Sequence, residues 1–61
     1  MEVAKLYTRG EAAEKLRMSV RMLDDRRALG KISFVRIGPK VLFRDQDLNQ
    51  FIEENIVSSN R

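Results

Sequence analysis

The chain has 61 residues and a net charge of +3, and it contains no cysteine and no histidine. At this length we expect one domain, and the two missing residue types exclude a disulfide framework and metal sites built from thiolates or imidazoles. No apolar run approaches the length of a signal peptide or a membrane span, so we expect a cytoplasmic protein without a membrane segment.

The first predicted element is a helix that starts after Thr8 and runs to about Arg17. Thr8 and Glu11 have the spacing of a capping box, in which each side chain satisfies a backbone N–H at the start of a helix. An apolar stripe that includes Ala12 and Ala13 follows at helical spacing. Because these side chains are small, we expect another element to pack closely against this helix.

The second predicted helix lies in the stretch SVRMLDDRRALGKI, residues 19–32. Ser19 is the expected N-cap, because its side-chain oxygen can accept a hydrogen bond from a backbone N–H of the first turn. Gly30 is the expected residue after the C-cap, where a positive φ favours glycine. Only about two residues separate the two helices, a connection typical of a helix-turn-helix.

A helical wheel divides the second helix into two sides. We expect the buried side to carry Met22, Leu23 and Leu29, and the exposed side to carry Arg21, Asp24, Asp25 and Ala28. Arg21 and Asp25 are four residues apart, so they can form an ion pair. Taken alone, the exposed side is more typical of an ordinary solvated surface with one weak ion pair.

The stretch ISFVRIGPKVLFR, residues 32–44, predicts a β-hairpin with its turn at Gly38-Pro39-Lys40. Each strand is expected to carry two apolar residues on one face, Val35 with Ile37 and Val41 with Phe43. Basic residues decorate the same hairpin, with Lys40 at the tip and Arg36 and Arg44 on the arms.

The last predicted element is a helix with Asp45 as its N-cap. Apolar residues recur after it at helical spacing, with acidic residues on the other side, at Leu48, Phe51, Ile52 and Ile56. We expect one domain over residues 1–61, with an ordered core from about residue 6 to residue 56 and a flexible tail at 57–61.

The charges are divided unevenly along the chain. Residues 1–44 carry a net charge of +6, whereas residues 45–61 carry −3. A basic body beside an acidic segment suggests a polyanionic partner on one side only, although a small soluble domain can carry such charges without a partner. In a helix-turn-helix followed by a basic hairpin, four side chains would follow one phosphate path along DNA: Arg17, Arg21, Arg36 and Lys40.

The region YTRGEAAEKLRMSVRMLDDRRALGKISFVRIGPKVLFRDQDLNQFI resembles the excisionase group of small winged-helix DNA-binding domains, and it is similar to the DNA-binding half of MerR-type regulators. The resemblance covers roughly residues 6–53. It rests on the order and spacing of short motifs, namely TRGEAA, the turn MSVR, the Leu-Gly at 29–30, VRIG, and Asp47-Leu48 followed by Phe51-Ile52. It implies a small α+β fold, a winged helix-turn-helix in the order helix, turn, helix, hairpin (the wing) and helix.

Members of this group bind DNA with the second helix in the major groove and the wing on the backbone or in the minor groove. Carried over by position, the reading face holds Ser19, Arg21 and Asp25, and the wing holds Arg36 and Lys40. Asp25 would orient an arginine or accept a hydrogen bond from a cytosine amino group. The first turn of the first helix, around Arg9, often meets a phosphate in such proteins.

Two features depart from the family pattern. The family often has basic or aromatic residues where this chain has Asp24 and Asp25, and this difference bears on the base contacts rather than on the fold. Relatives usually carry a large apolar or aromatic residue at the position of Arg26, whose aliphatic stem can cover the core while its charged head reaches solvent.

The resemblance implies a DNA-binding protein without catalytic activity or cofactor. Such proteins are typically excisionases of phages or mobile elements in bacterial hosts. Several copies bind beside an attachment site, bend the DNA and direct an integrase, here more plausibly of the tyrosine type, toward excision. The resemblance also implies head-to-tail self-association on DNA.

Two other functions stay open at this point. One is a small MerR-like transcriptional regulator, although the long dimerisation helix and effector domain of a full regulator do not fit in 61 residues. The other is a winged helix that binds proteins, which the acidic closing helix keeps open. An enzyme is least expected, because general bases and nucleophiles reduce to carboxylates, lysines, Tyr7 and hydroxyls.

Overall fold

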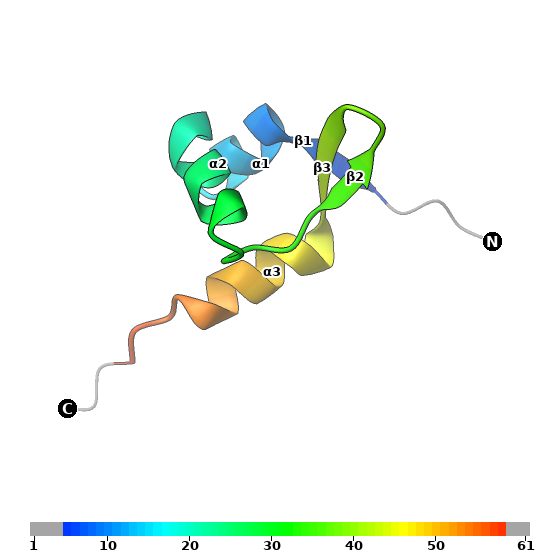
Figure 1. Ribbon diagram of the computed structural model, residues 1–61. Coiled ribbons are helices and arrows are strands. Elements are labelled where there is room, and N and C mark those ends of the chain that lie inside the picture. The colour runs from blue at the N-terminus through cyan, green and yellow to red at the C-terminus, as the bar shows by residue number, and fades with distance from the viewer. Residues whose placement is uncertain (1–4, 59–61) are drawn as a thin grey trace.

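Figure 1 shows the chain as a computed structural model in which residues 5–58 are described. Three helices pack with a three-stranded antiparallel sheet, so the expected α+β class is confirmed. In chain order the elements are β1 (Leu6–Thr8), α1 (Arg9–Lys15), α2 (Val20–Ala28), β2 (Val35–Ile37), β3 (Lys40–Arg44) and α3 (Asp45–Glu54). The two short helices, the hairpin and the closing helix are all present; residues 59–61 of the expected tail lie outside the described residues.

β3 is the central strand of the sheet, with β1 on one side and β2 on the other. Tyr7 of β1 pairs with Phe43, and Arg36 of β2 pairs with Val41. β1 is not among the predicted elements, because a strand of three residues carries too little alternation to be recognised locally. It forms because the second edge of β3 offers backbone N–H and C=O groups that need partners.

The hairpin turns at Gly38-Pro39, whereas Lys40, the third residue of the predicted turn, is the first residue of β3 and pairs with Ile37. Gly38 has a φ of 59°, and the ring of Pro39 holds its own φ at about −65°. A positive φ followed by a negative φ suits a type II′ turn, whose twist matches that of two antiparallel strands.

The start of α1 depends on the predicted capping box, which the structure confirms. Thr8 Oγ1 accepts from the Glu11 backbone N–H at 3.2 Å, and Glu11 Oε1 accepts from the Thr8 N–H at 3.0 Å. α1 ends at Lys15, two residues before the expected end at Arg17. It ends there because the chain folds back: the Met18 N–H donates to the Ala13 carbonyl at 2.9 Å, which closes the helix in a Schellman motif.

α2 begins and ends at its predicted capping residues. Ser19 Oγ accepts from the Met22 N–H at 3.1 Å. Gly30 has a φ of 74°, and the Lys31 N–H then donates to the Arg26 carbonyl at 2.8 Å, which completes a second Schellman motif. Both caps are local chemistry, which is why the sequence alone locates them.

The core lies between the helices and one face of the sheet. Its buried apolar side chains are Tyr7, Ala12, Ala13, Leu23, Ile32, Phe43 and Leu48. Half-buried side chains surround them, at Leu16, Met18, Phe34, Val41 and Phe51. The two alanines are almost fully buried, in agreement with the expected close packing against α1. This core is small, as expected for a domain of this length.

The predicted buried side of α2 is wrong at two of its three positions. Leu23 is fully buried, but Met22 is 45% exposed and Leu29 is 66% exposed. The buried side of α2 is narrow because the rest of it is occupied by the half-buried side chains of Arg26 and Arg27. Leu29 is the C-cap residue, beyond the last helical turn.

The junction of β3 and α3 corrects the predicted N-cap. Arg44, not Asp45, is the N-cap residue, and the capping acceptor is the buried carboxylate of Asp47. Asp47 Oδ2 accepts from the Arg44 backbone N–H and from Arg44 Nε, each at 3.0 Å, and Oδ1 accepts from Nη2. This set of hydrogen bonds from Arg44 to Asp47 starts the helix directly after the strand.

The apolar stripe of α3 is shorter than predicted. Leu48 is buried and Phe51 is half-buried, but Ile52 is exposed, and Ile56 lies beyond the end of the helix at Glu54. Only the first two turns of α3 therefore pack on the core.

We expect Asp47→Ala to lower the free energy of unfolding by about 2–3 kcal/mol, because it removes three hydrogen bonds and leaves the Arg44 guanidinium without its partner. Asp47→Asn is the matched control, since it retains an acceptor for the Arg44 N–H and loses only the charge. Denaturant unfolding at pH 7 should show the smaller loss for Asn. Equal stability of all three chains would contradict the role given to this carboxylate.

The same carboxylate should make stability depend on pH. The side-chain hydrogen bond from Arg44 lowers the pKa of Asp47, and burial opposes that shift. In the unfolded chain the pKa is about 3.9, so the contribution of Asp47 is complete above that value and is lost as the pH falls through the lower folded pKa. Thermal unfolding from pH 6 down to pH 2 should therefore fall less steeply for Asp47→Asn. Parallel curves would assign the acid sensitivity to other groups.

Candidate nucleic-acid interface

The exposed face of α2 is largely as predicted. Arg21, Asp25 and Ala28 are all exposed, and they lie together on one side of the helix. Figure 1 shows α2 at the left edge of the molecule, beside α1 and away from the hairpin, with α3 below it. The N-terminal turn of α2, from Val20 to Met22, is exposed at every side chain.

Asp24 does not belong to that solvated face. It is half-buried, and its two carboxylate oxygens accept from two arginines: Arg9 Nη1 at 3.0 Å and Arg27 Nη2 at 3.5 Å. The guanidinium of Arg27 in turn lies 5.1 Å from the centre of the Phe34 ring, within the range of a cation–π contact. Asp24 thus ties the start of α1 to α2 and to the segment that leads into β2.

The possible pair between Arg21 and Asp25 is not formed. Within residues 5–58, the ion pairs join Arg9 and Arg27 to Asp24, and Arg44 to Asp47. Two exposed side chains one helical turn apart gain too little from pairing to fix their rotamers. The predicted orientation of Arg21 by Asp25 therefore has no support in the structure of the chain by itself.

Arg9 lies where two parts of the fold meet. Its side chain is half exposed and already bound to Asp24, so only part of its guanidinium faces solvent. A shallow surface hollow is lined by Thr8 and Arg9 on one side and by the hairpin residues from Pro39 to Leu42 on the other. The structure therefore brings two of the predicted site residues together, Arg9 and Lys40.

Ser19 and Arg17 lie in the connection between α1 and α2. The Ser19 oxygen accepts the capping hydrogen bond, and its hydroxyl hydrogen remains available for donation. Arg17 is exposed and has a φ of 58°, the left-handed conformation that non-glycine residues rarely adopt. The β-carbon makes this conformation cost about 1–2 kcal/mol, whereas Gly30 serves the same Schellman position in α2 at little cost.

Arg36 and Lys40 lie on opposite faces of the hairpin. Arg36 pairs with Val41 and so shares the face of Val41 and Phe43, which is turned toward the core. Lys40 pairs with Ile37 and points to the other face. Both side chains are exposed. A single line of DNA phosphates, as expected from the sequence, could contact both residues only if it passed around the hairpin.

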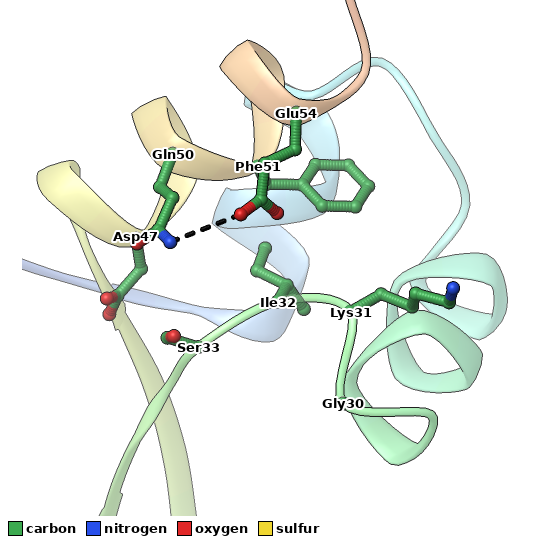
Figure 2. Close-up of a pocket in the computed structure, with 8 residues that line it drawn as sticks. All are labelled: Gly30, Lys31, Ile32, Ser33, Asp47, Gln50, Phe51 and Glu54. Atoms are coloured by element: carbon green, nitrogen blue, oxygen red, sulfur yellow. Dashed lines mark hydrogen bonds between the residues drawn. The ribbon is translucent and has the colours of Figure 1, made fainter.

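A second, small pocket lies between α3 and the loop that follows α2 (Figure 2). Phe51 and Ile32 close its apolar side, and the amide of Gln50 donates to Glu54 at 3.2 Å. Asp47 is the only buried acid at its wall, and Arg44 already occupies both of its oxygens. Because Gln50 and Glu54 bond to each other and Asp47 is bonded to Arg44, we regard this pocket as a packing feature between α3 and the loop. Residues 5–58 contain no cluster of three potential metal ligands.

Comparisons of the chain with protein-family models, with curated proteins and with solved structures gave no match. Among the described residues, no helix is long and apolar enough to cross a membrane. The assignment of the site therefore depends on the side chains themselves.

We expect Arg17→Gly to stabilise the fold by about 0.5–1 kcal/mol, because glycine adopts a positive φ without the β-carbon penalty. The greater conformational entropy of glycine in the unfolded chain offsets part of this gain. The rise in Tm should be about 3–6 °C for a domain of this size. Arg17→Ala is the matched control: it removes the same charge but keeps the β-carbon, so its Tm should not rise. A rise for both variants would show that the charge, rather than the backbone, limits stability.

Proposed function

We propose that this chain is a sequence-specific double-stranded DNA-binding module of the winged-helix type, with α2 as its recognition helix and the β2–β3 hairpin as its wing. The observation that carries the proposal is the division of the basic side chains into two groups. Arg9 and Arg27 form ion pairs with Asp24, and Arg44 forms one with Asp47. Exposed basic residues outside every ion pair of residues 5–58 include Arg17, Arg21, Arg36 and Lys40.

The dimensions of α2 suit a major groove. An α-helix with its side chains is about 10–12 Å in diameter, which fits the groove width of about 12 Å, and the nine residues of α2 present about two and a half turns to it. The exposed first turn holds Arg21, whose guanidinium can donate two hydrogen bonds to the O6 and N7 atoms of guanine. Ser19 and Arg17 precede it and can reach the flanking phosphates.

The two faces of the hairpin suit a groove with two phosphate walls. A wing that enters a minor groove has one DNA strand on each side. Arg36 on one face and Lys40 on the other would then contact different strands. This arrangement replaces the single path expected from the sequence.

Within this class, we propose the role of an excisionase-type accessory protein in the cytoplasm of a bacterial host. The support is the sequence resemblance, together with the charge division between a +6 body and a −3 closing segment. Adjacent copies on DNA can place the acidic α3 of one against the basic body of the next, a contact that repeats in one direction. An integrase, more plausibly of the tyrosine type, is the proposed partner, and bending of the DNA would assist it. A small transcriptional regulator on the same fold is the second candidate.

The first experiment is a DNA selection from a random duplex library, followed by band-shift titrations at two salt concentrations. The proposal expects an enriched motif and an affinity that falls steeply with salt, because phosphate contacts release counterions. No enriched motif, with weak and salt-independent retention, would contradict DNA recognition and favour a protein partner. If a motif is found, an excision assay with an integrase encoded beside this chain would distinguish an excisionase from a regulator.

We expect Arg21→Ala to weaken binding to the selected site by about 1–3 kcal/mol while binding to random duplex changes little. Arg21→Lys is the matched control, because it keeps the charge and loses the two-pronged hydrogen bonding to guanine. Competition band shifts should show a loss of specificity for both variants. If Arg21→Ala weakened binding to all sequences equally and Arg21→Lys restored the affinity, Arg21 would be a phosphate contact instead.

We expect Lys40→Ala to weaken binding to all sequences about equally and to lower the slope of log K against log salt by about one unit. Lys31→Ala is the matched control, since Lys31 is also exposed but lies beside α3 and the loop after α2. Its salt slope should stay at the wild-type value. If both variants have the wild-type slope, the hairpin tip lies outside the interface.

A further inference from the structure

Two apolar side chains stand in the exposed first turn of α2, on either side of Arg21. Val20 is 42% exposed and Met22 is 45% exposed. Neither side chain belongs to the core cluster or to the half-buried side chains that surround it. The fold therefore leaves two partly uncovered apolar surfaces at the end of the helix that carries the proposed base contact.

Neither residue is needed to build the helix. Valine is a weaker helix former than alanine or glutamate, because its branched β-carbon restricts the side chain against the preceding turn. The cap uses only the backbone N–H of Met22, which any residue except proline supplies at that position. Single exposed apolar residues are common on protein surfaces. Here two of them flank the proposed reading arginine within one turn.

The chemistry of the major groove offers one apolar partner for such side chains. Base-pair edges there present hydrogen-bond donors and acceptors, and thymine adds its C5-methyl group. We propose that Val20 and Met22 contact thymine methyl groups beside the guanine contacted by Arg21, so that the preferred site combines a guanine with neighbouring thymines. This inference rests on the proposed DNA-binding function, and it adds the identity of the bases and of two further specificity residues.

The test removes the methyl group without touching the hydrogen bonds. The probe is the duplex that the wild-type protein selects from the random library, with each thymine replaced in turn by deoxyuridine. Burial of one methyl group corresponds to about a fourfold change in affinity. We expect about that loss for the wild-type protein at one or two thymines next to the selected guanine, and no change at thymines further away.

The protein variants then assign each methyl group to a side chain. Val20→Ala and Met22→Ala should bind the thymine duplex more weakly and should no longer distinguish thymine from deoxyuridine at one position each. Both changes introduce the strongest helix former at exposed positions, so folding is retained. Leu29→Ala is the matched control: Leu29 is exposed and is the C-cap residue at the other end of α2, and its variant should keep the wild-type sensitivity.

The outcomes separate this inference from the function on which it rests. An enriched motif with guanine but no deoxyuridine sensitivity overturns the methyl contacts and leaves DNA recognition intact. A deoxyuridine effect that persists in both alanine variants, or that disappears in Leu29→Ala, overturns the assignment to Val20 and Met22. The absence of any enriched motif overturns both the function and this inference.

Discussion

The contact between Asp47 and Arg44 joins the central strand of the sheet to the closing helix. Arg44 ends β3, the only strand that pairs with both of the others, and Asp47 lies in the first turn of α3. Because the carboxylate binds both the backbone and the side chain of Arg44, the helix leaves the strand in one fixed direction. Leu48, the next residue, is thereby placed in the core. A domain with so few buried side chains depends strongly on one such junction.

Acidic residues have an architectural role in this basic protein. Asp47 neutralises Arg44 inside the fold, and Asp24 binds Arg9 and Arg27 where α1 meets α2. The mixed charge of α2 has a structural explanation in part, because one of its two aspartates orders neighbouring elements rather than facing a ligand. Among the exposed cations without an acidic partner in residues 5–58, Arg17, Arg21, Arg36 and Lys40 lie in the inter-helix turn, the first turn of α2 and the hairpin, whereas Lys5, Lys15 and Lys31 lie elsewhere.

Most features that depend on a few neighbouring residues could be predicted from the sequence, and features that depend on distant partners could not. The start of α3 is a local exception, because the acceptor that caps it belongs to Asp47 rather than to the predicted Asp45. The caps at Thr8 and Ser19, the end of α2 at Gly30 and the turn at Gly38 follow from local backbone chemistry, and all are correct. β1 exists only because β3 pairs with it. A helical wheel does not show which elements cover α2. It could therefore not predict that Met22 and Leu29 are exposed, that Asp24 is half-buried or that Arg21 forms no ion pair. The predicted base contacts stay a proposal for the same reason, since their partner is a second molecule.

The pairing of β1 with β3 has a consequence for the folding of the protein during its synthesis on the ribosome. Leu6–Thr8 finds its partner only in Leu42–Arg44, so the first strand cannot be paired until most of the chain has been synthesised. α1 and α2 are each too short to be stable alone in water. We therefore expect the chain to acquire stable structure only after Phe43 and Leu48 have been synthesised.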